Sequence, residues 1–155
     1  ALAAKSYTGK VESLNSNLGI KDAQLVIDAV FGTGFTGTLE PELVTLFDKV
    51  RAKAPVIVAI DIPSGIDATS GVIAEGTLKA NLTVTFCRRK PAHMLYPARA
   101  WCGRLYRADI GIPDACVADL NTQTFENNPA LWLAAFPIPT YDSHKFTRGH
   151  VTVYG

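Results

Sequence analysis

The sequence predicts an α/β fold built on a mainly parallel sheet, and three observations support this prediction. Two short apolar runs, at residues 25–31 and 56–60, have the β-branched character of strands buried on both faces. The first run contains one acidic residue, Asp28, the second is followed by Asp61, and a flexible loop comes after each. An amphipathic helical pattern separates the two runs. Strand, helix and strand at this spacing form a right-handed βαβ unit, in which the two strands are parallel.

The helix between the two runs is predicted over residues 40–53. Leu43, Leu46, Phe47 and Val50 recur at helical spacing and form one apolar face. Pro41 stands near the first helical position, where its missing N–H group is tolerated. Acidic residues open the segment and basic residues close it, which matches the helix dipole.

Two further strands are predicted over residues 78–86 and 103–112, separated by a basic, proline-broken loop. A short helix over 129–136, capped by Asn128, and a last strand over 150–154 complete the chain. Residues 1–7, ALAAKSY, resemble the tail of a helix closed by Gly9, and residues 10–21 are polar with a turn at 17–19. We therefore expect a three-layer Rossmann-like sheet with helices on both faces, incomplete at the N-terminus.

Composition narrows the choice of partners. The chain has 155 residues, 48% of them apolar, and a formal net charge of +1. This near-neutral balance gives no electrostatic reason to expect nucleic acid or an anionic membrane as a partner. No apolar run approaches the ~20 residues that cross a bilayer. Three widely spaced cysteines favour a reducing compartment over a disulfide framework or a zinc site, so we expect a cytoplasmic protein.

The loop 32–37, GTGFTG, matches the G-x-G-x-x-G pattern that lets a dinucleotide pyrophosphate approach the backbone at a helix N-terminus. The fit is imperfect, because Asp28 stands in the strand before the loop and the helix begins after the third glycine. A phosphate- or nucleotide-facing loop and a plain strand-to-helix connection both stay open. Asp61, at the end of the next strand, suits a ribose-binding acid and favours the functional interpretation.

Asp28 lies within an apolar run, where a carboxylate is costly to bury unless it is paired, hydrogen-bonded or bound to a cation. A hydrogen bond to loop amides would be enough to hold it. With Asp61 at the adjacent strand end and Ser64 three residues later, a hard-cation site made of oxygen ligands becomes a competing interpretation.

Arg88, Arg89 and Lys90 follow the third predicted strand at the same edge of the sheet. Three cations there could neutralise phosphates, and a solvated basic loop is at least as consistent with the pattern. His93 and His150 have no partner at metal-ligand spacing, so we interpret them as surface or structural residues.

Three segments in this order resemble the YjeF N-terminal domain, the NAD(P)H-hydrate epimerase family. They are VIDAVFGTGFTG, VAIDIPSGIDATSG and ANLTVTFCRRKPAHMLYPARAWCGRLYRADIGIP, at about residues 25–113. The tail SHKFTRGHVTVYG is similar to the opening strand of the ADP-dependent NAD(P)H-hydrate dehydratase domain of bifunctional repair enzymes. This divides the chain into residues 1–136, the C-terminal part of the epimerase domain, and 137–155, a connector and first strand of a truncated, ribokinase-like dehydratase domain.

The resemblance implies an isomerase that interconverts the S and R forms of hydrated NADH or NADPH during cofactor repair. Its substrate is a small molecule, its cation is potassium, and ADP or ATP serves only the missing dehydratase domain. A homo-oligomer is left open. Family roles make Asp28 and Ser64 potassium ligands. The implied substrate contacts are Gly32, Thr33, Gly34, Phe35, Thr36, Gly37, Thr38 and Asp61.

Asp61 is the predicted catalytic acid–base group, because it ends the second strand and a flexible turn follows it. The family's upstream Asn-Asn-Gly-Gly-Asp-Gly loop is absent from these residues, so we expect the chain as given to bind or turn over poorly. Two alternatives remain. One is a Rossmann oxidoreductase that uses GTGFTG for NAD(P), which Asp28 does not support. The other is a non-catalytic nucleotide-binding scaffold of the same fold.

Overall fold

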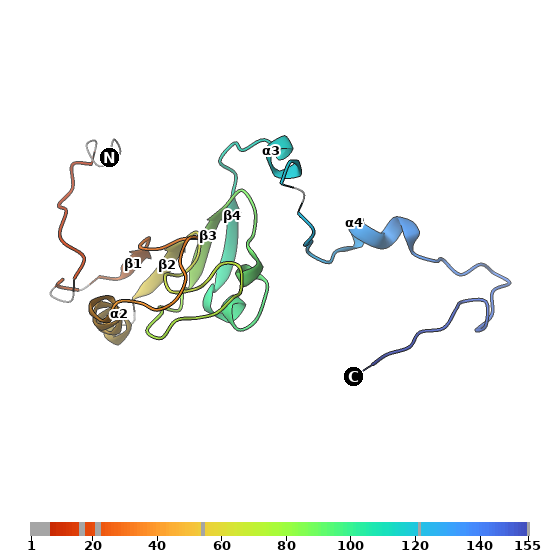
Figure 1. The fold of residues 1–155 in the computed structure, drawn as a ribbon, viewed down its shortest axis with the longest axis horizontal. Helices are drawn as coiled ribbons and strands as arrows, with labels where there is room; N and C mark the ends of the chain where they lie inside the picture. Colours follow the sequence, from red (N-terminus) through yellow and green to blue (C-terminus); the bar gives the residue numbers. More distant parts are fainter. Residues whose placement is uncertain (1–6, 16–17, 21–22, 54, 121, 155) are drawn as a thin grey trace. The chain divides into compact units, whose positions relative to one another are not determined.

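A computed structural model describes residues 7–15, 18–20, 23–53, 55–120 and 122–154 (Figure 1). The chain divides into two compact units, Ala1–Ile112 and Pro113–Gly155, and each is described here by itself. The first unit contains the sheet and all the predicted site residues.

The first unit is built on a four-stranded sheet whose neighbouring strands are all parallel. The strands lie side by side in chain order (Figure 1): β1 (Leu25–Asp28), β2 (Val56–Ile60), β3 (Leu82–Phe86) and β4 (Arg104–Ala108). Parallel neighbours need a crossover connection, and helix α2 (Pro41–Lys53) provides it between β1 and β2. The predicted α/β class with a parallel sheet is confirmed.

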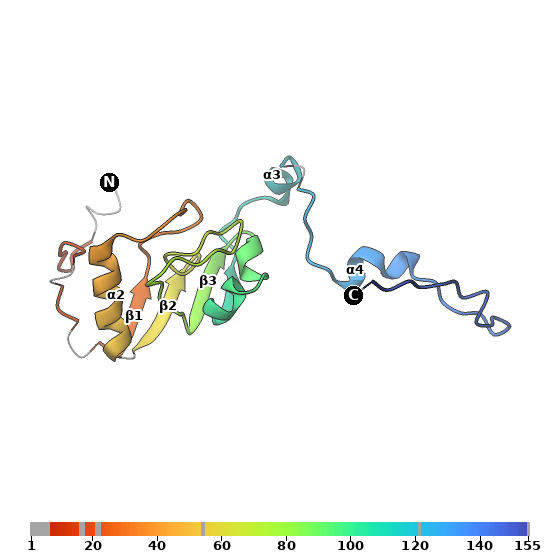
Figure 2. The same ribbon diagram turned by 60° about the horizontal axis from the view of Figure 1, so that its bottom comes forward.

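Helix α2 lies along one face of the sheet (Figure 2). Its four predicted apolar residues are all buried and share a core with Ile57 and Ala59 of β2. Burying one such side chain contributes about 1.5–3 kcal/mol, so this face fixes the helix against the strands. The opposite face of the sheet carries apolar side chains that are more than half exposed: Leu25, Ile27, Val56 and Tyr106.

A second, smaller core holds the turn that follows β2. Two 3-10 helices, η1 (Pro91–His93) and η2 (Ala98–Trp101), come between β3 and β4. Their buried alanines, Ala92 and Ala98, pack with Ile62 and Ile66 from the loop after β2. The packing of Ile62 and Ile66 therefore fixes the backbone of the loop that contains Asp61 and Ser64.

Strand β3 is shorter than predicted, because Asn81 takes part in the ladder through its side chain. The Ile57 amide donates to Asn81 Oδ1, and the Asn81 amide donates to the Ile57 carbonyl, both at 2.8 Å. Regular pairing with β2 begins only at Leu82, not at residue 78. The predicted strand 103–112 likewise extends only over Arg104–Ala108.

Among its described residues, the second unit contains three short helices: α3 (Asp114–Ala118), α4 (Pro129–Trp132) and η3 (Leu133–Ala135). Asn128 caps α4 as predicted, since its Oδ1 accepts from the Ala130 amide at 3.0 Å. Residues 150–154 were predicted as a strand and have no regular secondary structure. A strand needs a hydrogen-bonded neighbour, and the described part of this unit has none. The assignment of 137–155 to a dehydratase domain stays a prediction. Across the described ranges, each helix is too short or too polar to cross a membrane.

Candidate active site

The first part of the site is a buried pair, Asp28 at the end of β1 and Ser64 in the turn after β2. Their exposed fractions are 2% and 0%. The Ser64 amide donates to Asp28 Oδ2 at 2.8 Å, and the Ser64 hydroxyl donates to Oδ1 at 2.5 Å. The hydroxyl in turn accepts from the Phe31 amide at 2.9 Å. The two residues predicted as potassium ligands are therefore in direct contact, and they join the ends of two neighbouring strands.

The hydrogen bonds from Ser64 also explain how the Asp28 carboxylate can be buried at the end of an apolar strand. Both Asp28 oxygens accept hydrogen bonds from Ser64, so the carboxylate is satisfied by the protein itself. It also explains why β1 ends at Asp28, three residues before the predicted end of this strand. The backbone turns there to bring the Phe31 amide to Ser64.

The donor set around Asp28 fits a cation in type. The Asp28 carboxylate, the Ser64 hydroxyl and the Phe31 carbonyl, which lies 3.4 Å from that hydroxyl, are all oxygen donors suited to a hard cation. One carboxylate supplies one negative charge, which suits a monovalent ion better than a divalent one. Within the described residues, no group of three or more His, Cys, Asp or Glu side chains could hold a metal ion.

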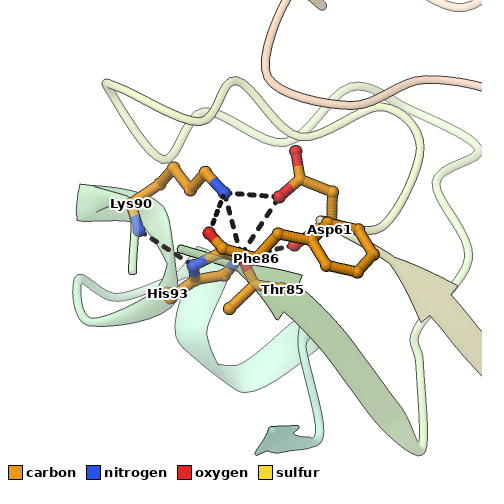
Figure 3. A network of polar contacts seen from close by, with 5 residues as sticks. All are labelled: Asp61, Thr85, Phe86, Lys90 and His93. Carbon is orange, nitrogen blue, oxygen red and sulfur yellow. Dashed lines mark hydrogen bonds and ion pairs between the residues drawn. The ribbon is translucent and has the colours of Figure 1, made fainter. Parts of the chain in front are cut away.

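The second part of the site is Asp61, the first residue after β2. Its backbone has a φ of 70°, a left-handed conformation that aspartate tolerates better than most residues. Its Oδ1 accepts from Lys90 Nζ at 2.5 Å and from the Thr85 hydroxyl at 3.0 Å (Figure 3). The Lys90 and Asp61 side chains are 22% and 18% exposed. This ion pair is therefore largely shielded from solvent and stronger than an exposed pair.

His93 connects the two ends of this ion pair through their backbones (Figure 3). The Lys90 amide donates to His93 Nδ1 at 3.0 Å, and His93 Nε2 lies 2.9 Å from the Asp61 carbonyl oxygen. Because Nδ1 accepts, the ring proton is on Nε2 and is donated to that carbonyl. Burial lowers the pKa of the His93 imidazole, and the nearby Lys90 charge adds to this effect, although the hydrogen bond to the Asp61 carbonyl opposes it.

The glycine-rich loop begins beside Asp61. A Cβ atom built on Gly32 would lie 3.2 Å from Asp61 Oδ2, a tight contact, so this position favours glycine. The loop does not open a helix, because α2 begins only at Pro41. The Phe35 side chain is 8% exposed and packs into the core with α2, so it anchors the loop. The three threonines of the loop, Thr33, Thr36 and Thr38, are exposed.

The structure brings Asp28, Asp61 and Ser64 to the same edge of the sheet, as expected from the sequence, but sequence reasoning missed the contacts of Lys90 and His93. We interpreted Lys90 as a phosphate-neutralising or solvated cation, and it instead folds back onto Asp61. His93 is structural, as one of the two interpretations held, but it is 2% exposed and contacts the Asp61 backbone. A signal was present in the spacing, since Lys90-Pro91-Ala92-His93 places a histidine where it can accept from the first backbone amide of a helical turn.

The sheet is parallel, and a buried carboxylate, a glycine-rich loop and a shielded Lys–Asp pair lie at the carboxyl ends of its strands. This arrangement is that of a Rossmann-like α/β protein. The family model of the YjeF-related protein N-terminus matches residues 2–92. The chain belongs to this family, and the resemblance stated from the sequence is confirmed.

Curated relatives of known name agree with this family. The chain is 38% identical to the bifunctional NAD(P)H-hydrate repair enzyme Nnr of Mycobacterium tuberculosis over 96% of this chain and 29% of that protein. It is 39% identical to the protein of the same name from Archaeoglobus fulgidus, over 86% of this chain and 26% of that protein. It is 39% identical to an NAD(P)H-hydrate epimerase of Limosilactobacillus fermentum, over 58% of this chain and 43% of that protein. The chain therefore spans less than a third of the bifunctional relatives.

Proposed function

We propose that this protein interconverts the S and R forms of hydrated NADH and NADPH, as the epimerase part of a bifunctional enzyme of nicotinamide cofactor repair. The names of the relatives support this activity. The observation that carries the proposal is the orientation of Asp61. One carboxylate oxygen is held by Lys90 and Thr85, and the other is turned toward the start of the glycine-rich loop.

Asp61 acts in this proposal as the acid–base group. In a hydrated nicotinamide ring, the carbon that carries the hydroxyl group is also bonded to the ring nitrogen. If this C–N bond opens, the carbon becomes a planar carbonyl carbon, and the nitrogen can close onto its other face. A base that takes the hydroxyl proton during opening and returns it after closing leaves no net change in atoms. In this proposal, Asp61 Oδ2 is this base.

The loop from Gly32 to Thr38 contacts the dinucleotide. Gly32 lets the substrate and the Asp61 carboxylate lie close together, since any side chain there would fill that space. The exposed hydroxyls of Thr33, Thr36 and Thr38 can donate hydrogen bonds to phosphate or ribose oxygens. The Phe35 side chain is buried in the core with α2, so Phe35 contacts the substrate through its backbone.

Asp28 and Ser64 would hold a potassium ion, with the Phe31 carbonyl as a further oxygen donor. The fit rests on the oxygen-only donor set and the single carboxylate charge. A bound ion would neutralise Asp28 and fix the two turns that carry Phe31 and Ser64. ADP or ATP is used only by the dehydratase domain of the intact enzyme. The protein acts in the cytoplasm on this small-molecule substrate, with no nucleic acid or membrane as partner.

The test is an exchange assay that starts from the separated R form of hydrated NADPH. The intact protein is added together with an S-specific, ADP-dependent dehydratase, and recovered NADPH is followed by its absorbance. The proposal predicts that the protein consumes the R form well above the rate without it. An unchanged rate with tight binding of the hydrate would instead indicate a non-catalytic scaffold. Oxidation of NADPH in the presence of simple carbonyl compounds would indicate an oxidoreductase.

A further inference from the structure

All three N–H donors of the Lys90 ammonium group are used within the protein. Its ammonium group lies 2.5 Å from Asp61 Oδ1, 2.9 Å from the Thr85 hydroxyl and 3.4 Å from the Phe86 carbonyl oxygen (Figure 3). An ammonium group has three N–H donors, and these three oxygens account for all of them. Lys90 therefore has no donor left for a substrate phosphate, although it follows β3 in a basic stretch of the chain.

The contacts of the Asp61 carboxylate are asymmetric. Oδ1 accepts from both Lys90 and the Thr85 hydroxyl, whereas no hydrogen bond from the described residues reaches Oδ2. Oδ2 is the oxygen that faces Gly32, where it would be 3.2 Å from an added Cβ atom. Holding Oδ1 therefore fixes the rotation of the carboxylate and leaves the lone pairs of Oδ2 for another ligand.

The backbone supports the same arrangement. His93 accepts from the Lys90 amide and donates to the Asp61 carbonyl, so one buried ring sets the separation between the two chain segments. Asp61 is held at a φ of 70° within these contacts. A left-handed aspartate at a strand end, fixed from both its backbone and its side chain, is typical of a residue held for function.

From these contacts we propose that Lys90 is a positioning residue for the acid–base group of the reaction. Its ammonium, with Thr85, holds Oδ1 of Asp61 and keeps Oδ2 directed at the substrate, and it does not bind the substrate phosphates. His93 fixes the distance between the backbones of Lys90 and Asp61 through its two ring nitrogens. This inference rests on the proposed epimerase activity, because it assigns a role within that reaction.

The test compares Lys90→Ala with Lys90→Met, and with Lys79→Ala as the matched control. Lys79 is exposed and lies outside the site. Both Lys90 variants should lower kcat for epimer exchange on the order of 10- to 100-fold, because a misplaced acid–base group loses about this much. KM should change by less than about threefold, since no substrate contact is lost. Lys79→Ala should match the wild type.

Chemical rescue separates positioning from a merely structural role. Lys90→Ala lacks the atoms of n-propylammonium, so adding this cation should restore part of kcat in Lys90→Ala and change nothing in the wild type. Wild-type kcat in both variants, a raised KM with unchanged kcat, or no rescue in a folded Lys90→Ala protein would overturn the proposal. If Lys90→Ala does not fold, Lys90→Met decides. If neither folds, the role of Lys90 is structural and the proposal is wrong.

The same exchange assay distinguishes a failure of the proposed role of Lys90 from a failure of the proposed epimerase function. If the wild-type protein exchanges the epimers and the Lys90 variants do so equally well, only the role of Lys90 is refuted. If the wild-type protein does not exchange them, the proposed function fails, and the role of Lys90 in it fails too.

Discussion

Ser64 donates both its amide and its hydroxyl to the carboxylate of Asp28, and the two residues are 0% and 2% exposed. They lie 36 positions apart in the chain, at the ends of two neighbouring parallel strands. One serine thus satisfies a buried charge, accepts from the Phe31 amide and joins β1 to the turn after β2.

Replacing this hydroxyl should destabilise the fold. Ser64→Ala removes the donor to Asp28 Oδ1 and leaves the Phe31 amide without its acceptor. We expect the free energy of unfolding to fall by about 1–3 kcal/mol, the usual cost of unsatisfied buried polar groups. Urea denaturation measures this change. Ser13→Ala, at an exposed serine, should stay within about 0.5 kcal/mol of the wild type. An equal effect of both variants would contradict the structural role of Ser64.

Potassium should stabilise the protein through Asp28. An ion that binds only the native state adds about 1.4 kcal/mol to the free energy of unfolding when its concentration is about ten times Kd. Thermal unfolding in potassium chloride and in choline chloride at equal ionic strength measures the effect as a higher Tm with potassium. Asp28→Asn should abolish the difference, whereas the exposed Asp109→Asn should keep it. No potassium effect in the wild type would refute the proposed ion site.

The sequence was sufficient to predict the features that depend on local pattern. The end of β2 just before Asp61 follows from a short apolar run, and α2 follows from its apolar spacing, because both patterns report directly which face is buried. The closeness of the Asp28 and Asp61 strand ends required only that neighbouring parallel strands end at the same edge of the sheet, whereas the direct hydrogen bonds from Ser64 to Asp28 were not predicted.

Contacts that depend on long-range folding were not predicted. Lys90 reaches Asp61 across 29 positions, and this depends on a three-residue 3-10 helix that no periodicity reveals. A lone histidine such as His93 has no sequence pattern that indicates which backbone groups it will contact. Asn81 shortens β3 because its side chain, not its backbone, accepts from the Ile57 amide, and pattern reasoning treats an asparagine there only as a weak strand former.

His93 should make stability depend on pH near neutrality. Burial lowers the pKa of His93 in the folded state, so the unfolded chain binds a proton at this residue more readily. The contribution of the neutral His93 ring to the free energy of unfolding is fully present above the pKa of histidine in the unfolded chain, about 6.5. It is lost as the pH falls through the lower pKa of His93 in the folded protein. The wild type should therefore lose more of its free energy of unfolding between pH 7.5 and 5.5 than His93→Gln loses.

Urea denaturation at the two pH values measures this difference. His150→Gln provides the control, because it removes an exposed histidine far along the chain and should keep the wild-type pH response. Equal losses in the wild type and in His93→Gln would show that the His93 ring does not contribute to the pH dependence of folding.

Gly32→Ala should impair exchange by displacing Asp61. The new Cβ atom would lie 3.2 Å from Asp61 Oδ2, so the carboxylate must shift by a few tenths of an ångström away from its position. Because Lys90 and Thr85 hold the other oxygen, this shift strains the contacts that orient the base. We expect kcat to fall by about 10-fold. Gly34→Ala adds its Cβ where nothing lies within 4 Å, and its effect on kcat should be smaller. Steady-state exchange kinetics compare the two variants, and a larger loss in Gly34→Ala would show that the loop, and not the orientation of Asp61, limits the reaction.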